Sequence, residues 1–399
     1  MTIMLGLSIV LFLLGIAEYI IHLRNVKRVV VRIHVNGIRG KSMTTRFIAG
    51  GLRAAGFRVL AKTTGSSAQL ILEDGTELPI KRRGMPRIIE QARIMSIARK
   101  RNIDVLVMEC MAISPEIQWV SEHRLVRSHI GVITNVRLDH TDYMGSDLDT
   151  VAATLSLSVP RSGTLVTTRH QFVPQFKKRA KELDTAVVEV TDRDITEGEV
   201  SQFNRPVFRE NLALALKVCS LLGVSRDIAM HGMRNTADDP GAFNVFSVTR
   251  GKRCIYLVNA FAANDPESTM MAWELWRTWP RYQHMKEMPV IGLFNNRLDR
   301  GFRLKSLSEM VVSRLQLSHI ILVGRPTVLS RRTLIKVGVD PSKIIVFRGP
   351  WGSNQFTSRL IEEIDSLAGC DVVLFGFGNV KGPGQQVIEY FQNNGRALP

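Results

Sequence analysis

Short apolar runs alternate with amphipathic segments along nearly the whole chain. The runs are rich in Val and Ile and predict strands, while the segments between them repeat apolar residues at the spacing of one helix face. In the first part, strands are expected at 29–35, 57–62, 103–109, 129–135, 163–168 and 186–191, with helices that include 41–55, 86–100 and 147–157. This alternation predicts an α/β fold with a mostly parallel sheet.

A second alternating set follows a pair of helical segments and a break. The helices are expected at 209–222 and 227–233, and the Pro-Gly pair within residues 238–243 then predicts a hinge between domains. Further strands are expected at 254–259, 290–295, 319–323, 344–347 and 371–375, with helices at 266–277, 304–315, 355–367 and 384–392. We therefore expect one domain over residues 24–240 and a smaller, Rossmann-like α/β domain over residues 241–399.

Residues 1–23 are apolar apart from a few positions such as Glu18, and as a helix they match one bilayer thickness. Arg24, Lys27, Arg28 and Arg32 follow, and by the positive-inside rule they keep the rest of the chain on the cytoplasmic side. The sequence thus predicts a single-pass transmembrane anchor in the inner (cytoplasmic) membrane. A cleaved signal peptide is the alternative, but a basic n-region and a small-residue cleavage site are not evident.

Composition changes this picture through its charge. Apolar content of 45% and charged content of 22% are ordinary for a folded protein, but the net charge of +17 is not. Between Tyr19 and Leu72 the chain has ten Lys and Arg and no Asp or Glu, which favours an anionic partner such as a nucleotide, an acidic substrate, anionic lipid or nucleic acid. A nucleic-acid partner is not expected, because no basic patch interleaved with aromatic residues and no readout motif is evident. Four scattered cysteines fit a reducing compartment.

The segment VNGIRGKSMTTR, residues 35–46, follows the first strand and has the form of a short phosphate-binding loop. The glycines at 37 and 40 and the start of the following helix offer backbone N–H groups to a phosphate. Lys41 can neutralise the β- and γ-phosphates, and the Ser42 hydroxyl can coordinate Mg²⁺. The alternative is an ordinary strand–turn–helix with an exposed lysine.

Two later strand ends carry chemistry that could complete this site. Glu109 ends one predicted strand, and its carboxylate could hold the same Mg²⁺ if the two strands are neighbours. After another strand, Asn135, Asp139, His140 and Asp142 crowd the segment ITNVRLDHTDYMG. A histidine and carboxylates at this point could form a second metal position.

These three pieces together resemble the ATP site of the Mur ligase superfamily, which includes folylpolyglutamate synthase. The phosphate loop of that family has its first glycine three residues before the second, so Gly37 supplies what Val35 cannot. FRENLALALKVCSLLG, VNAFAANDPES and DVVLFGFGN resemble later family segments. The anchor followed by HVNGIRGKS, KTTGSSA, ECMAISPE, TNVRLDHTD and FAANDPEST most resembles the membrane-anchored ligase subunits of bacterial poly-γ-glutamate synthase, which act in capsule biosynthesis.

The resemblance implies an ADP-forming acid–amino-acid ligase. It would activate the carboxylate of a glutamate chain as an acyl phosphate and join it to the amine of glutamate, using ATP with Mg²⁺ or, alternatively, Mn²⁺. The implied catalytic residues are Lys41, Glu109 and His140, and the implied metal ligands are Ser42, Glu109 and His140. The implied nucleotide contacts are Gly37, Arg39, Gly40, Lys41, Ser42, Met43, Asn211 and Asn264. Substrate contacts are expected from Lys62, Thr63, Thr64, Asn135 and Asp139, with Gly65 in the same loop.

The expected partners are glutamate, the growing poly-γ-glutamate chain, the membrane and small membrane subunits, and a homo-oligomer is left open. Arg39, Lys62, Arg82, Arg83 and Arg87 are candidates to guide a polyanion, although a basic surface facing the membrane explains them equally well. The chain departs from the family at Asn259 and Ala263, and residues 145–160 contain no lysine to match a second-metal ligand of some members. The alternative function is an ATP-binding scaffold, whose slow ATP turnover glutamate would not stimulate.

Overall fold

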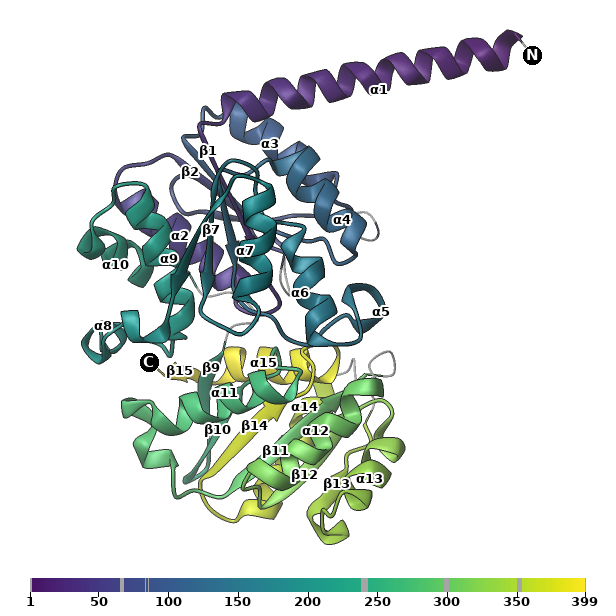
Figure 1. Cartoon of the computed structure of the whole chain (residues 1–399). Coiled ribbons are helices and arrows are strands. Elements are labelled where there is room, and N and C mark those ends of the chain that lie inside the picture. The colour runs from purple at the N-terminus through teal and green to yellow at the C-terminus, as the bar shows by residue number, and fades with distance from the viewer. Residues whose placement is uncertain are drawn as a thin grey trace. The chain divides into compact units, whose positions relative to one another are not determined.

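The computed structural model describes residues 2–64, 68–82, 84, 86–237, 243–297, 301–349 and 354–398. Gly65, Arg83 and most of the expected hinge, residues 238–242, lie outside the described residues. The chain divides into two compact units (Figure 1). The first comprises Met1–Gln202 with Val207–Asp239, and the second comprises Phe203–Pro206 with Pro240–Pro399.

The first unit is built on an eight-stranded sheet with the order β4-β3-β2-β5-β1-β6-β7-β8. Its strands are β1 (Val31–Asn36), β2 (Val59–Lys62), β3 (Gln69–Ile71), β4 (Glu77–Pro79), β5 (Val105–Glu109), β6 (Ile130–Ile133), β7 (Thr164–Thr168) and β8 (Ala186–Val190). The run from β2 to β8 is parallel, whereas β3 and β4 extend one edge in antiparallel pairing. The two antiparallel strands are not among the sequence expectations.

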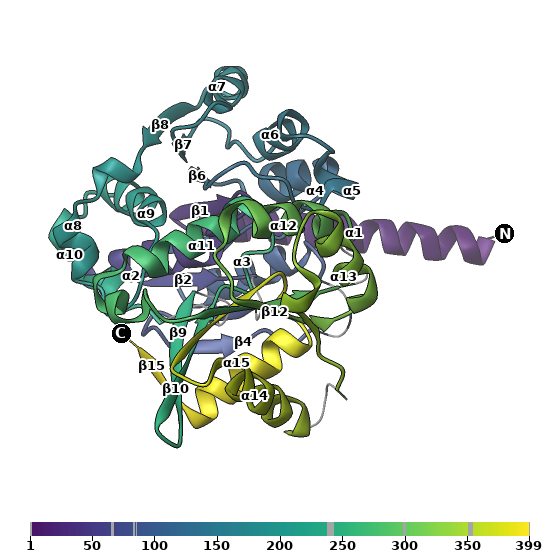
Figure 2. The ribbon, with the colours of Figure 1, turned by 90° about the horizontal axis from the view of Figure 1, so that it is seen from below.

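Helices cover both faces of this sheet (Figures 1 and 2). On one side, α2, α9 and α10 pack against one another, and on the other α3 and α4 pack against the π-helix η1 while α6 packs against α4 and α7. The helices of this unit are α1 (Thr2–Arg28), α2 (Lys41–Ala54), α3 (Glu90–Lys100), α4 (Pro115–Val120), η1 (Ser121–Val126), α5 (Thr141–Met144), α6 (Leu148–Ser156), α7 (Val173–Glu182), η2 (Asp192–Asp194), α8 (Glu197–Ser201), α9 (Arg209–Leu221) and α10 (Arg226–Arg234). The β-branched strands supply apolar positions to both layers, as a parallel sheet requires.

The second unit has a seven-stranded sheet with the order β13-β12-β11-β14-β10-β9-β15. Its strands are β9 (Asn244–Arg250), β10 (Arg253–Asn259), β11 (Val290–Asn296), β12 (His319–Gly324), β13 (Ile344–Val346), β14 (Val372–Phe377) and β15 (Arg396–Leu398). Its helices are α11 (Pro266–Thr278), η3 (Pro280–Met285), α12 (Gly301–Arg314), α13 (Thr327–Lys336), η5 (Pro341–Lys343), α14 (Asn354–Ala368) and α15 (Pro383–Asn394). The five strands from β13 to β10 are parallel, while β9 and β15 pair antiparallel at the edge.

The prediction of an α/β fold with mostly parallel sheets is confirmed. Besides the antiparallel strands β3, β4, β9 and β15, which were not expected, two differences lie at element ends. The strand expected at 29–35 begins only at Val31, because α1 continues through Arg28 and Val29 is buried in the core beyond it. The helix expected from residue 86 begins at Glu90, since Arg87–Glu90 forms a turn closed by the bond from the Glu90 N–H to the Arg87 carbonyl.

The N-terminal helix α1 has two parts that differ in their surroundings. Among the described residues it is the one helix long and apolar enough to cross a membrane, and its side chains from Ile3 to Ile21 are exposed. Beyond that point Asn25 and Val26 are buried, and α1 packs on α3 and η1. Arg32 donates to the carbonyls of Val26 (2.9 Å) and Val29 (2.8 Å), which satisfies acceptors at the end of the helix. The end of α1 is therefore part of the core of the first unit.

Candidate functional site

Three predicted segments follow adjacent strands of the first sheet. β1 lies between β5 and β6, and Val35 is in register with Glu109 on one side and with Val132 on the other. Because these strands are parallel, the loop after β1, the end of β5 and the segment after β6 all lie at one edge of the sheet. Ligands of open α/β sheets bind at this carboxyl edge.

The loop between β1 and α2 requires glycine at both predicted positions. Gly37 has a φ of +117°, and a Cβ there would overlap the Thr134 hydroxyl. Gly40 has a φ of +79°, and a Cβ there would overlap the side-chain oxygen of Asn211. Only glycine combines these backbone angles with such close contacts. The loop therefore lies directly against the segment after β6 and the start of α9.

Lys41 begins α2, and its ammonium lies over the loop. Nζ donates to the carbonyl of Gly37 at 2.8 Å and to that of Ile38 at 3.3 Å. Burial lowers the pKa of Lys41, and the nearby Glu109 carboxylate opposes this change by raising it. An ammonium in this position is adjacent to the N-terminal amides of α2, so a phosphate in the loop would meet both.

Glu109 joins the loop to the end of β2. The residue is 2% exposed, and its carboxylate accepts hydrogen bonds from the Ser42 hydroxyl (2.9 Å), the Thr64 N–H (2.7 Å) and the Thr64 hydroxyl (2.5 Å). A hydroxyl and a carboxylate in contact are the hard oxygen donors that suit Mg²⁺. Within the described ranges no three His, Cys, Asp or Glu side chains converge on a metal position, so phosphate oxygens and water would complete the shell.

The segment after β6 is bound to the loop through Arg39. The Arg39 N–H donates to the side-chain oxygen of Asn135 (3.0 Å), and its carbonyl accepts from the Asn135 amide (3.1 Å) and the Thr134 hydroxyl (2.6 Å). The Arg39 guanidinium also pairs with Asp139 at 2.9 Å. Asn135 and Asp139 therefore shape the phosphate loop itself.

His140 precedes α5 in a left-handed backbone conformation, with a φ of +50°. Its N–H donates to the Asp139 carboxylate at 2.6 Å, and Nε2 lies 3.9 Å from the same oxygen. The side chain is about one-third exposed, so a ligand can reach it, and residues held in such a conformation concentrate at functional sites. Asp142, the fourth member of the sequence cluster, lies on α5 and is exposed.

The expected substrate residues at the end of β2 differ in exposure. Lys62 is fully buried, and its Nζ pairs with Glu90 at 3.0 Å. Burial lowers the pKa of Lys62, and Glu90 acts in the opposite direction. Thr63 is also buried, with its hydroxyl accepting from the Gln69 N–H at 3.2 Å. Thr64 is the member of this set that contacts Glu109.

The other expected nucleotide residues come from three elements. Met43 is half-buried in the first turn of α2, and Asn211 in α9 lies against Gly40. Asn264 belongs to the second unit, directly before α11. Contact of these residues with a nucleotide remains a prediction.

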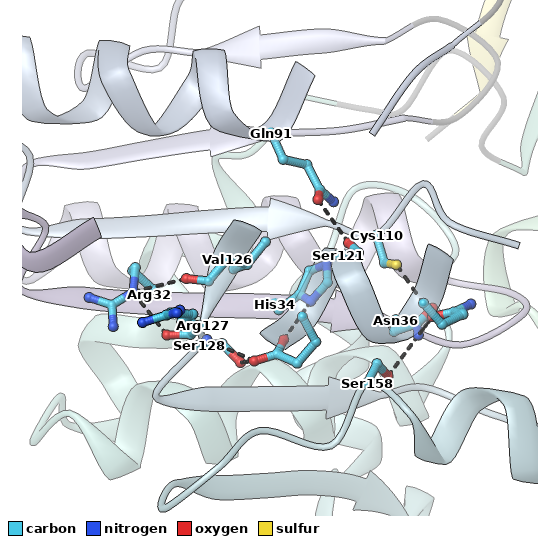
Figure 3. A network of polar contacts seen from close by, with 12 residues as sticks. Arg32, His34, Asn36, Gln91, Cys110, Ser121, Val126, Arg127, Ser128 and Ser158 are labelled. Atoms are coloured by element: carbon cyan, nitrogen blue, oxygen red, sulfur yellow. Dashed lines mark hydrogen bonds and ion pairs between the residues drawn. The ribbon is translucent and has the colours of Figure 1, made fainter. Parts of the chain in front are cut away.

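A buried polar network behind the loop is absent from the sequence expectations (Figure 3). It begins with Arg32, His34 and Asn36, which alternate along β1 and therefore share one face. His34 Nδ1 lies 2.7 Å from Glu122 Oε2, with both side chains 1% exposed. Glu122 belongs to η1, and its other oxygen accepts from the N–H and hydroxyl of Ser128.

The network extends towards both ends of β1. The Arg32 guanidinium donates to the carbonyls at the end of η1, and the Asn36 amide donates to Gln118 (2.7 Å) and Ser158 (2.8 Å). Burial by itself would lower the pKa of His34, but Cys110 and Glu122 outweigh it and raise the pKa to about 10. This direction favours a protonated imidazole paired with the Glu122 carboxylate. The period-two series of polar residues in VRIHVN is the sequence signal that could have revealed this face.

Comparisons with known proteins show which families the chain matches. The Mur ligase middle domain family matches residues 35–194, and the poly-gamma-glutamate synthase CapB C-terminal domain family matches residues 245–394. Among curated proteins, the PGA synthase CapB of Bacillus subtilis (strain 168) is 33% identical over 95% of both chains. The capsule biosynthesis protein CapB of Bacillus anthracis is 32% identical over 96% of this chain and 81% of that protein.

Solved structures show the same fold at low sequence identity. Folylpolyglutamate synthase of Mycobacterium tuberculosis, complexed with ADP and AMPPCP, superposes with a TM-score of 0.70 at 14% identity, covering 94% of each chain. The bifunctional folylpolyglutamate synthase/dihydrofolate synthase with Mn, AMPPNP and L-glutamate bound has a TM-score of 0.66 at 16% identity over 93% of this chain and 92% of that one. The near-complete match to the two CapB proteins decides the relationship: this chain belongs to the CapB family of poly-γ-glutamate synthases, within the Mur ligase superfamily.

Proposed function

We propose that this chain extends poly-γ-glutamate by joining the terminal carboxylate of the growing chain to the amine of glutamate. As a CapB family member it is an ATP-dependent amide ligase of poly-γ-glutamate synthesis. The observation that carries the proposed site is the meeting of the Gly37–Ser42 loop, Glu109 and the Asn135–His140 segment at three adjacent strand ends.

The reaction has two steps. First, a carboxylate oxygen attacks the γ-phosphorus of ATP, the bond to the β–γ bridging oxygen breaks, and ADP leaves. The α-amine of glutamate then attacks the acyl carbon, loses a proton and expels inorganic phosphate. Because negative charge builds on oxygen atoms in both steps, the site must supply preorganised positive charge and N–H donors.

Lys41 and the loop amides are the proposed donors for the triphosphate. When ATP is bound, Lys41 exchanges its bonds to the Gly37 and Ile38 carbonyls for bonds to β- and γ-phosphate oxygens. The N–H groups of Gly40, Ser42 and Met43 contribute the positive end of α2. Arg39 keeps the loop in shape through Asp139, and Asn211 and Asn264 are the proposed contacts to the rest of the nucleotide.

Ser42 and Glu109 are the proposed protein ligands of Mg²⁺, or of Mn²⁺ in its place. The Ser42 hydroxyl and the Glu109 carboxylate lie 2.9 Å apart and are both oxygen donors, as Mg²⁺ requires. The Mn and AMPPNP bound in the folylpolyglutamate synthase/dihydrofolate synthase structure also support a divalent metal with the nucleotide. Bound there, the metal would neutralise triphosphate charge. Thr64 orients the Glu109 carboxylate, and Asp139 orients His140, which is the proposed ligand of a second metal position.

The substrate carboxylate is proposed to enter beside Thr64. Lys62 and Thr63 are buried, so they would act by positioning the end of β2. Lys62 does so through its ion pair with Glu90, and Thr63 through the hydrogen bond that it accepts from the Gln69 N–H. Arg82, which also pairs with Glu90 at 2.8 Å, and the exposed Arg87 would attract the polyanionic chain over a longer range.

We further propose that α1 anchors the chain in the inner membrane, with both units in the cytoplasm, where ATP is available. The apolar, exposed part of α1 and the basic residues that follow it support this arrangement. The small membrane subunits and a homo-oligomer stay predictions, and co-purification with a mass measurement in detergent tests them.

Membranes that contain the full chain provide the test of function. With ATP and Mg²⁺, addition of labelled glutamate is expected to stimulate ADP release and to place label in a growing polymer in the same reaction. Ser42→Ala should lower both signals by about tenfold or more, because it removes a metal ligand, while the exposed Ser220→Ala on α9 should leave them unchanged. ATP turnover that ignores glutamate would favour the scaffold function and reject the ligase.

A further inference from the structure

The end of the first sheet opposite the phosphate loop carries a basic depression beside α1. It has a volume of about 610 Å³ and is lined by Arg28, Val30, Arg99, Lys100, Asn102, Ile103 and Asp104. Three of these residues are cationic, and the one carboxylate, on Asp104, already accepts from the Arg58 N–H at 2.9 Å. The depression therefore has net positive charge and suits an anion.

The position of this depression relative to α1 identifies what it faces. The apolar stretch ends near residue 23, and Arg28 lies five residues further along the same helix, about 8 Å at the helical rise. The headgroup layer outside the hydrocarbon core is about 5–8 Å thick on each side. If α1 spans the membrane as proposed above, Arg28 and the depression lie at the level of the lipid phosphates.

Contacts between α1 and the rest of the first unit hold the neighbouring residues at the same depth relative to the membrane. The Arg99 guanidinium donates to Asn25 at 3.5 Å, and Arg124 donates to the Tyr19 hydroxyl at 3.5 Å. His22 lies 3.2 Å from the Arg124 carbonyl. Because Tyr and Arg are typical of the membrane interface, these contacts are consistent with a unit that rests on the bilayer. In Figure 1, α1 leaves the unit beside α3, which ends at Lys100.

We propose that the depression lined by Arg28, Arg99 and Lys100 binds the phosphate of an anionic glycerophospholipid, so that the first unit is docked on the membrane. Val30, which is 70% exposed, would enter the interface beside the headgroup. The loop with Lys41 lies at the other end of β1, about 20 Å away at the rise of a strand. Docking would thus turn the nucleotide site away from the bilayer, towards the cytoplasm. This inference rests on the proposed anchor and not on the ligase chemistry.

Hydrogen exchange of the full chain in nanodiscs tests the proposal. We compare discs of phosphatidylcholine alone with discs that also contain phosphatidylglycerol, and follow the backbone amides of residues 97–104. Exchange should be several-fold slower with phosphatidylglycerol at low salt, and high salt should abolish the difference. Arg99→Gln with Lys100→Gln should abolish it too, whereas Lys178→Gln with Lys181→Gln, an equal loss of charge from exposed positions on α7, should preserve it.

Three other outcomes of the exchange experiment would count against the proposed lipid site. Equal exchange in both kinds of disc would overturn it, and so would equal protection by inorganic phosphate in phosphatidylcholine discs, because that indicates a free-anion site. A chain that does not insert into discs would reject the anchor and this inference together. Glutamate-stimulated ADP release, measured on the same samples, reports separately on the ligase function.

Discussion

Lys41→Ala is expected to reduce ATP-dependent amide formation by about 10²–10³-fold, because it removes a preorganised charge from the developing phosphoryl oxygens. The first unit should remain folded. In the absence of nucleotide the substitution removes two hydrogen bonds to loop carbonyls, each worth about 1 kcal/mol. ADP release and polymer growth measure the first effect, and thermal unfolding measures the second.

Lys178→Ala is the matched control, because it removes an exposed lysine from α7 in the same unit. It should change neither turnover nor stability. Near-normal amide formation by the Lys41→Ala protein would contradict the role given to the loop, whatever the nucleotide affinity of that variant.

Glu122→Gln is expected to lower the free energy of unfolding of the first unit by about 3–5 kcal/mol, because it leaves the buried cation of His34 without its carboxylate. Glu189→Gln is the control. Glu189 pairs with Lys177 and Arg169 at the surface, where such pairs contribute less than about 1 kcal/mol. Urea unfolding is monitored through hydrogen exchange of the backbone amides in β1 and η1, so the measurement reports on the first unit alone. Equal stability of the Glu122→Gln and wild-type proteins would contradict the buried ion pair.

The same pair predicts how stability depends on pH. The pKa of His34 is raised from 6.5 to about 10, so its contribution is complete below about pH 6.5 and is lost as the pH rises towards 10. Burial raises the pKa of Glu122, but His34 and the hydrogen bonds from Ser128 together outweigh burial and lower the pKa below 4.5, so this contribution is lost in acid. Because Cys110 also raises the pKa of His34, Glu122→Gln should reduce the alkaline loss without removing all of it. An unchanged alkaline slope in that variant would count against this explanation.

The parts of the site that the sequence predicted are local in the chain. Gly37, Gly40 and Lys41 occur within one loop, where glycine spacing and the strand before it carry the signal. The contact of Ser42 with Glu109 joins residues 67 positions apart, and it depends on β5 being the neighbour of β1 in the sheet. That strand order comes from packing of the whole sheet, so from the sequence the contact could be predicted only on the condition that the two strands are neighbours.

Other features had little or no local signal. The strands β3 and β4 have three residues each, and they form by pairing at the sheet edge rather than by an apolar pattern. His34 finds Glu122 across 88 residues, in a π-helix that helical periodicity does not indicate. The end of α1 is similar: its basic residues predicted a membrane flank, but burial of Val26 depends on α3 and η1.

The central claim is that the Gly37–Ser42 loop, Glu109 and the Asn135–His140 segment hold one ATP with its metal. Its most direct test is an experimental structure of the full chain with Mg²⁺ and a non-hydrolysable ATP analogue. Our account predicts the triphosphate against the loop, Lys41 on its β- and γ-phosphates, and Mg²⁺ bound by Ser42 and, directly or through water, by Glu109. A triphosphate bound elsewhere, with Lys41 still on the Gly37 carbonyl, would contradict it.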